Sequence, residues 1–123
     1  MSEYIRFNVY VKVKEGRLEE FRGIARDWSA WQKQARPDIL SYEWFFPEQD
    51  PMTAQVMEVY ESSEAILATL QEVDASEVAE EPDYPYEMTK IEVCGPVSDA
   101  LKARLDKGKS PIEYWTRING FTR

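Results

Sequence analysis

Glu58 and Tyr60 stand two residues apart in a short β-like run, and their side-chain types could move a proton. On a strand this spacing puts both side chains on one face. A carboxylate can act as a general base when burial raises its pKa, and a neighbouring phenol can donate a hydrogen bond. Alternation along the strand is expected to turn the pair away from the helices. We therefore favour a salt bridge from Glu58 to Lys12 or Lys90, and a base is the alternative.

Tryptophan side chains offer surfaces on which a planar ring could stack. Trp28 and Trp31 lie about one turn apart in a helix-like segment, and Trp44 lies in the strand-like segment that follows. Trp115 and Phe121 belong to an aromatic C-terminal tail and are candidates for a lid over a pocket or a contact with a partner subunit. Filling of the core is the favoured role for Trp28 and Trp31, and surface packing is an equal alternative for the tail residues.

The chain contains no histidine and a single cysteine, Cys94. Imidazole is the commonest metal ligand, the usual proximal haem ligand and the usual general base. Nucleophile–histidine catalysis and two-histidine metal sites are therefore excluded, and one cysteine can form neither an internal disulfide nor a cysteine-only metal site. We expect no metal and no bound cofactor, and proton chemistry falls to Asp, Glu, Tyr, Lys or the substrate itself.

Charge and hydropathy exclude several partner classes. The 23 acidic residues outnumber the 15 basic residues, and the formal net charge of −8 opposes binding to nucleic acids or anionic lipid surfaces. The sequence contains no run of 18 apolar residues, the length that a membrane-spanning helix needs, and its first residues lack the features of a secretion signal. The sequence predicts a cytoplasmic protein.

The periodicity of apolar residues gives the order of the elements. Strand-like alternation covers residues 7–14, 40–46, 54–60 and 89–94, and helix-like spacing covers residues 18–35, 62–73 and 98–108. Acidic residues 74–83 are expected to form an exposed loop, and the aromatic tail at 111–121 should pack against the rest of the chain. The order predicts one α+β domain over residues 1–123, of the ferredoxin-like βαββαβ type, with an added C-terminal helix and tail.

A sheet with both helices on one side leaves its other face uncovered. The covered face is expected to carry Phe7, Val9, Val11, Tyr42, Trp44, Met57, Val59, Ile91 and Val93. The uncovered face then carries Asn8, Tyr10, Phe45, Val56, Tyr60 and Cys94 among the charged residues Lys12, Glu43, Glu58, Lys90 and Glu92. Because this face is rich in aromatics, we expect a second copy of the chain to cover it; a monomer is the alternative. Asn8 could orient a carbonyl there, but bonding to interface backbone is its favoured role.

Five segments, in this order and spacing, resemble the antibiotic biosynthesis monooxygenase family over nearly the whole chain. They are residues 11–21, 39–44, 58–65, 95–99 and 120–123. The resemblance implies a dimeric α/β barrel made of two ferredoxin-like subunits, with a pocket between each sheet and its own helices. Characterised members oxidise aromatic polyketides or quinols with molecular oxygen and without a bound cofactor.

Thr69 stands at the family position that normally faces the pocket, where many members carry histidine and haem-degrading relatives carry tryptophan. The resemblance therefore implies that Thr69 could offer its hydroxyl to a bound carbonyl, or instead bond to its own helix backbone. Histidine-assisted chemistry and haem degradation are not expected. The leading hypothesis is a cofactor-independent monooxygenase acting on a phenolic, quinol or polyketide-like aromatic. The alternatives are a member of the same superfamily that binds, isomerises or protects a small metabolite, and a dimeric module without turnover.

Overall fold

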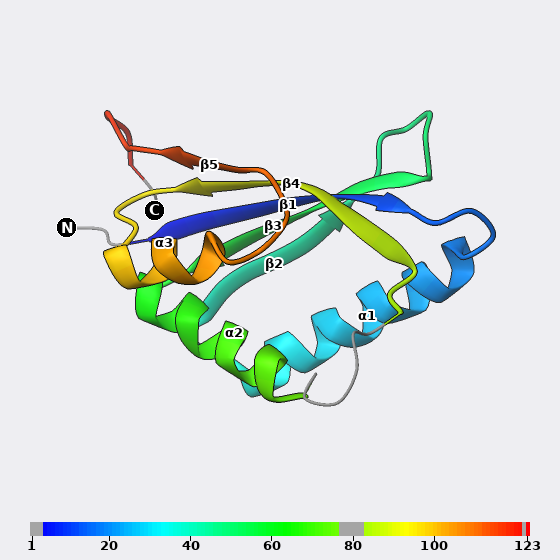
Figure 1. The fold of residues 1–123 in the computed structure, drawn as a ribbon, viewed down its shortest axis with the longest axis horizontal. Helices are drawn as coiled ribbons and strands as arrows, with labels where there is room; N and C mark the ends of the chain where they lie inside the picture. Colours follow the sequence, from blue (N-terminus) through cyan, green and yellow to red (C-terminus); the bar gives the residue numbers. More distant parts are fainter. Residues whose placement is uncertain (1–3, 77–82, 122) are drawn as a thin grey trace.

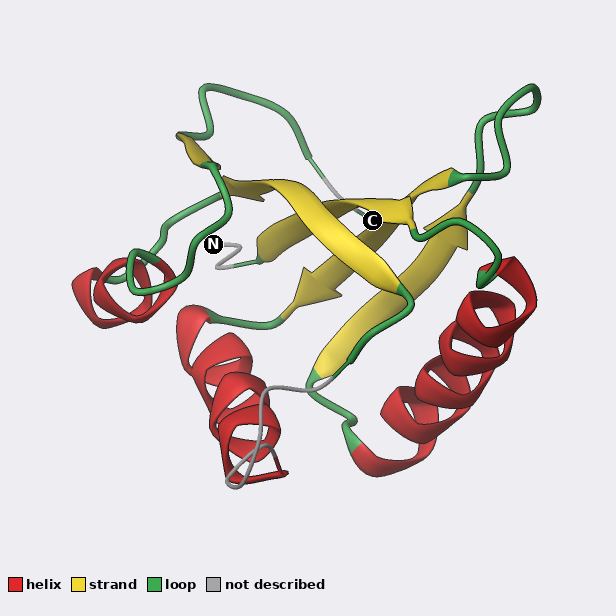
Figure 2. Cartoon of the chain, turned by 45° about the vertical axis from the view of Figure 1, so that its right-hand side comes forward, coloured by secondary structure: helices red, strands yellow, loops and turns green. Residues whose placement is uncertain are grey.

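In the part of the chain that the structure describes, five strands form one sheet, and three helices lie on one side of it (Figures 1 and 2). The computed structural model describes residues 4–76, 83–121 and 123. The elements are β1 (Ile5–Val13), α1 (Leu18–Ala35), β2 (Ile39–Phe45), β3 (Thr53–Tyr60), α2 (Ser63–Ser76), β4 (Tyr86–Cys94), α3 (Asp99–Leu105) and β5 (Ile112–Trp115). Most of the predicted acidic loop, residues 77–82, lies outside the described residues.

The strand order is β2-β3-β1-β4-β5. The first four strands pair antiparallel, and β5 joins the edge of β4 in parallel. This topology confirms the predicted ferredoxin-like α+β class. The tail was expected only to pack against the chain, but it adds a strand. The open edge of β4 offers unpaired backbone groups, and the tail satisfies them. For example, the Ile91 amide donates a hydrogen bond to the Pro111 carbonyl (2.8 Å).

Serine side chains fix where two of the helices begin. Ser62 Oγ accepts a hydrogen bond from the Ala65 amide (3.2 Å) at the start of α2, and Ser98 Oγ accepts one from the Leu101 amide (3.1 Å) at the start of α3. Each bond satisfies a backbone donor that the helix itself leaves unpaired. Both helices begin where these serines in the sequence predict. Local capping signals therefore determine where α2 and α3 begin.

The predicted facing of β3 is wrong. Phe7 pairs with Glu58, and Val9 pairs with Val56, so these four residues share the face that the helices cover. Tyr60 lies on the same face and is buried, whereas Met57 lies on the opposite face and is exposed. Apolar residues occupy both alternating sets of this strand, so alternation alone could not decide which set points inward. The error moves Glu58 and Tyr60 from the uncovered face to the interior.

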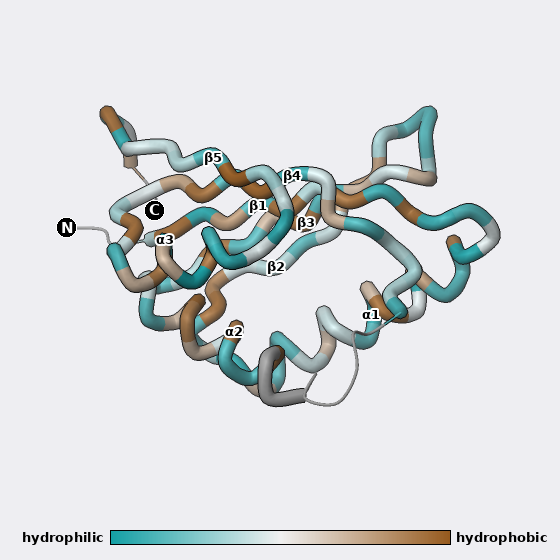
Figure 3. Tube along the Cα trace, in the orientation of Figure 1, coloured by the Kyte–Doolittle hydropathy of each residue, from teal (hydrophilic) through white to brown (hydrophobic). Residues whose placement is uncertain are grey.

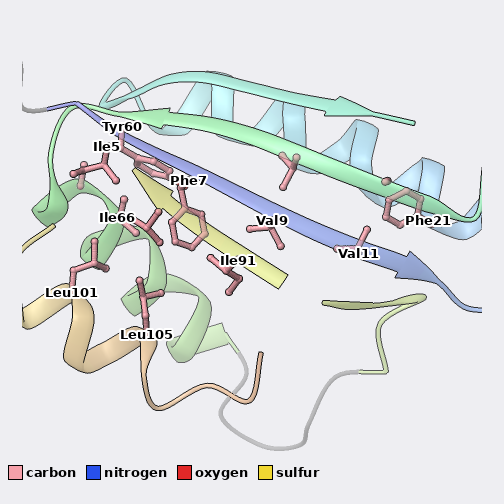
Figure 4. Packing of buried hydrophobic residues seen from close by; sticks show 14 of the residues in the cluster. Ile5, Phe7, Val9, Val11, Phe21, Tyr60, Ile66, Ile91, Leu101 and Leu105 are labelled. Carbon is pink, nitrogen blue, oxygen red and sulfur yellow. The ribbon is translucent and has the colours of Figure 1, made fainter. Parts of the chain in front are cut away.

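The buried apolar residues form one cluster under the helices. Figure 4 shows Phe7, Ile66, Leu101 and Leu105 together where α2 and α3 meet the sheet, while Phe21 lies apart on α1. Figure 3 shows that much of α1 is hydrophilic. No helix within the described residues is long and apolar enough to cross a membrane. Phe21 and Gln32 are the buried residues of α1, so its apolar contact with the sheet is thin.

Arg36 links the end of α1 to β2 and α2. Its guanidinium donates to both carboxylate oxygens of Asp38 (3.1 and 2.9 Å) and to the Ala65 carbonyl (3.2 Å), and it lies 3.3 Å from a Glu72 oxygen. The bidentate bond to Arg36 holds the pKa of Asp38 below its ordinary value. The contribution of Asp38 to stability is therefore present above the unfolded-state pKa and is lost as the pH falls through the lower folded-state pKa.

Replacing this buried arginine is expected to loosen the contact between the two helices. The Arg36→Gln variant should lose about 1–3 kcal/mol in free energy of unfolding at pH 7, because the Ala65 carbonyl and Asp38 lose a charged donor. Urea denaturation measures the loss. Arg26→Gln, on the exposed side of α1, is the control and should change stability by less than about 0.5 kcal/mol. Equal effects of the two substitutions would contradict the assignment.

Candidate functional site

A cavity of about 350 Å³ lies between the sheet and the helices. This volume is near the lower end of the range of about 300–1,000 Å³ that is usual for ligand pockets. The side chains that matter for chemistry and shape come from several elements: Trp28 and Gln32 of α1, Tyr42 and Trp44 of β2, Glu58 and Tyr60 of β3, Thr69 of α2, and Tyr86 and Met88 of β4. The walls are mostly aromatic and aliphatic, so the cavity suits a small apolar molecule.

Glu58 is a carboxyl group buried in this cavity, with only 7% of the residue exposed. The Tyr60 hydroxyl donates a hydrogen bond to Glu58 Oε1 (2.5 Å). The predicted lysine partners lie on the other face of the sheet. Lys90 is 3.8 Å from Glu92 and 3.3 Å from Glu113, and Lys12 is exposed between the buried Val11 and Val13. The salt-bridge interpretation of Glu58 is therefore wrong, and its recorded partner is a neutral phenol.

Burial raises the pKa of Glu58 to about 7, and the hydrogen bond from Tyr60 opposes this rise. At neutral pH the group is therefore present in both protonation states. A carboxyl with such a pKa can accept a proton and return it, which is the property of a general acid–base group.

Two phenols beside Glu58 keep their protons. Burial raises the pKa of Tyr60, and the negative charge of Glu58 raises it further. Burial is also the main cause that raises the pKa of Tyr42, again with a contribution from the Glu58 charge, and the Trp44 indole acts in the opposite direction. Tyr42 pairs with Glu58 across β2 and β3, so its hydroxyl is a donor near the carboxyl.

Thr69, Trp28 and Trp44 all line this cavity. The Thr69 hydroxyl donates to the Ala65 carbonyl (3.1 Å), which is the helix-backbone alternative considered for it. Trp31 packs edge-on against Trp28, with ring centroids 6.3 Å apart, but it is 45% exposed and does not line the cavity. Of the four pocket candidates predicted on α1, β2 and α2, the structure therefore brings three together and leaves Trp31 at the surface.

Trp115, Phe121 and Asn8 lie outside the cavity. Trp115 pairs with Cys94 on the face away from the helices, while its neighbours Ile112 and Tyr114 turn inward. Trp115 is 52% exposed and Phe121 is 76% exposed, and both line a separate shallow hollow that includes Cys94. Asn8 lies on the same uncovered face, since its pair partner on β3 is the outward-facing Met57. Among the described residues, the tail therefore does not form a lid over this cavity.

Gln32 and Tyr42 line the cavity but were not predicted as site residues. Ile24, Trp28 and Gln32 follow each other at four-residue spacing, so helical periodicity pointed to Gln32, and only its polar type excluded it from an apolar stripe. Tyr42 is two residues from Trp44 on the covered face of β2 and was assigned only to the core. Among the described residues, no group of three or more Asp, Glu or Cys side chains is arranged to hold a metal ion.

Glu58 is expected to make the protein less stable as the pH rises. Its folded-state pKa of about 7 exceeds the unfolded-state value of about 4.3, so the folded chain holds more protons between these values and loses stability across that window. A Glu58→Gln variant cannot ionise, and its free energy of unfolding relative to the native protein should rise by about 1–3 kcal/mol between pH 5 and pH 8. Urea denaturation at both pH values tests this. The exposed Glu43→Gln control should show no such relative gain; a gain equal to that of Glu58→Gln would contradict the assignment.

No family model matches the chain, and no curated protein matches it. Solved structures do. MupZ from Pseudomonas fluorescens is 20% identical, with 100% of this chain and 91% of that chain covered and a TM-score of 0.76. A candidate antibiotic biosynthesis monooxygenase from Caulobacter crescentus is 20% identical, and the match covers 79% of this chain and 92% of that chain with a TM-score of 0.57. A mutant of SnoaB, a cofactor-independent oxygenase from Streptomyces nogalater, is 14% identical, and the match covers 57% of this chain and 69% of that chain with a TM-score of 0.52.

At these identities the similarity concerns the fold. The matched structures include the family that five segments of the sequence resemble. The chain has the fold of the antibiotic biosynthesis monooxygenase structures.

Proposed function

We propose that this chain is a cofactor-independent monooxygenase in which Glu58 removes a proton from a small aromatic substrate bound under the helices. The single observation that carries the proposal is a carboxyl group buried in an aromatic cavity beside a phenol, with a pKa near 7. The cavity supports a phenolic, quinol or polyketide-like ring system as the substrate. The similarity to SnoaB, a cofactor-independent oxygenase, supports the reaction class.

The proposed reaction needs only the substrate and oxygen. Glu58 takes a proton from an acidic C–H or O–H group, and the resulting carbanion or phenolate is the reductant. One electron passes to oxygen, recombination of the two radicals gives a peroxide anion, and the protonated Glu58 returns its proton to form the hydroperoxide. Loss of water from that hydroperoxide leaves a carbonyl, so an aryl CH₂ group plus O₂ becomes C=O plus H₂O. One oxygen atom enters the product, the other leaves as water, and all four electrons come from the substrate.

The neighbouring side chains support each requirement of this step. Tyr42 remains protonated and lines the cavity, so its hydroxyl is available to donate to an oxygen that becomes negative when the substrate loses its proton. Trp28 and Trp44 offer aromatic surfaces within the same cavity. Apolar walls exclude water, which keeps the substrate anion reactive toward oxygen rather than solvated.

Oxygen uptake with anthrone as the probe tests the proposal. Metal-free protein is compared with the Thr69→Val and Trp28→Phe variants, and the spontaneous oxidation of anthrone is subtracted. Uptake that equals anthraquinone formation, and that falls in the variants, supports the monooxygenase. Absence of protein-dependent uptake across anthrone and a panel of hydroquinones would overturn it.

Proton transfer without oxidation is the second candidate function. The carboxyl group of Glu58 and the protonated phenol of Tyr42 together could isomerise a ketone through its enolate, since one removes a proton and the other stabilises the oxyanion. The same probe separates the two functions. Under nitrogen, protein-dependent exchange of the anthrone CH₂ protons for deuterium, with no oxygen uptake in air, would favour the isomerase.

We also propose a homodimer formed through the uncovered face of the sheet. With the facing of β3 corrected, this face carries Phe45, Met57 and Trp115 as exposed large apolar residues, together with Asn8 and Tyr10. A second copy would remove this apolar surface from water. Sedimentation at micromolar concentration should give about twice the 14.4 kDa chain mass, and a single 14.4 kDa species would overturn the dimer.

A further inference from the structure

Gln32 carries a buried acceptor that no described residue satisfies. The residue is 3% exposed, it lines the cavity, and its Oε1 atom has no hydrogen-bond partner within residues 4–76, 83–121 and 123. Buried polar side-chain atoms are nearly always hydrogen-bonded, because an unpaired one forfeits its bonds to water. An acceptor in this state at the wall of a ligand-sized cavity points to a donor supplied by the ligand.

Three other polar side chains of the cavity either have a partner already or can only donate. The Tyr60 hydroxyl is committed to Glu58, and the Thr69 hydroxyl is committed to the Ala65 carbonyl. The Trp44 indole Nε1 is buried without a hydrogen bond in the described part of the chain, and it can only donate. Gln32 Oε1 is therefore an acceptor that a bound molecule can use in addition to the carboxyl group of Glu58.

We infer that the substrate carries a second hydrogen-bond donor, a hydroxyl or N–H group, which binds Gln32 Oε1 while Glu58 removes a different proton. A dihydroxylated aromatic fits this requirement, and a monohydroxylated ring or a bare hydrocarbon does not. Trp28 lies one turn before Gln32 on α1 and also lines the cavity, so a ring stacked there would present a substituent toward Gln32. The inference rests on the proposed function only in placing the substrate in this cavity.

Binding of matched ligands tests the inference without any turnover. Calorimetric titration under nitrogen compares a panel of naphthalenediols with their monomethyl ethers, in which one donor has become an acceptor. For at least one diol we expect the native protein to bind the diol roughly tenfold or more tightly than its ether, because the ether leaves Gln32 Oε1 unpaired. The Gln32→Met variant keeps the side-chain length but has no comparable acceptor, so the diol-to-ether ratio should fall to about one.

Gln34→Met is the matched control, because Gln34 lies on the same helix with its side chain exposed. It should keep the native diol-to-ether ratio. Since no described residue bonds to Gln32 Oε1, Gln32→Met should also keep or raise the melting temperature. An unchanged ratio in Gln32→Met, equal binding of every diol and ether by the native protein, or no binding of any diol would overturn the inference. These readouts do not depend on oxygen uptake, so they fail or succeed separately from the monooxygenase proposal.

Discussion

The Glu58→Gln variant is expected to lose about 100- to 10,000-fold in kcat/KM for oxidation of an anthrone-type substrate. Glutamine cannot accept the proton, and Glu58 is the carboxyl group that the structure places in the cavity among the residues that line it. The variant retains the shape of the side chain, so the loss should appear with little change in substrate affinity. Steady-state oxygen uptake and calorimetric binding measure the two quantities.

The pH dependence separates a lost base from a damaged fold. In the native protein kcat/KM should rise as Glu58 loses its proton and level off above a midpoint near pH 7, and this rise should be absent from Glu58→Gln. Glu43→Gln is the matched control, since Glu43 pairs with Met57 on the uncovered face, and it should keep both the rate and the midpoint. A Glu58→Gln protein that retains native activity would remove Glu58 from the mechanism.

Phe21→Ala is expected to cost about 3–5 kcal/mol in free energy of unfolding. Phe21 is fully buried and contacts three rings edge-on, with centroid distances of 5.3 Å to Trp44, 5.9 Å to Phe46 and 5.5 Å to Tyr86. It is one of only two residues of α1 that are buried in the described structure. Truncation would remove the main apolar anchor of α1 and one edge-on ring contact from each of two cavity-lining rings, Trp44 and Tyr86.

Urea denaturation followed by circular dichroism measures this loss. Trp31→Ala removes a larger but 45% exposed side chain from the same helix and should cost less than about 1 kcal/mol. Phe21→Leu keeps most of the buried volume and gives a readout if the alanine variant does not fold; it should lose less than half as much. A loss for Phe21→Ala no greater than that for Trp31→Ala would show that α1 is held in place by other contacts.

The sequence predicted the elements well because their local signals are strong. The residues from Leu18 to the Arg36-Pro37 stop match α1, and Ser62 and Ser98 mark the starts of α2 and α3. The added strand β5 was missed because four residues of β character gain stability only when an open sheet edge accepts them. That edge is a property of the assembled sheet and not of the tail.

Which residues form the candidate site was harder to predict, because facing was ambiguous at two places. On β3 both alternating sets contain apolar residues, and the prediction turned the set with Glu58 outward, although its pair partner Phe7 is in the core. On α1 the apolar stripe favoured Trp31 over Gln32, and the structure buries Gln32. Both errors have one cause. Functional sites bury polar groups, and sequence patterning assigns polar groups to the surface.

The central claim is that Glu58 is a carboxyl group with a pKa near neutrality inside the cavity, and its titration tests that claim most directly. Carboxyl ¹³C signals of glutamate-labelled protein are followed by NMR against pH, and the Glu58 signal is assigned as the one missing from Glu58→Gln. We predict a midpoint near pH 7, which moves higher in Tyr60→Phe because the hydrogen bond that favours the carboxylate is lost. A midpoint near pH 4, the value of an exposed glutamate, would contradict the account.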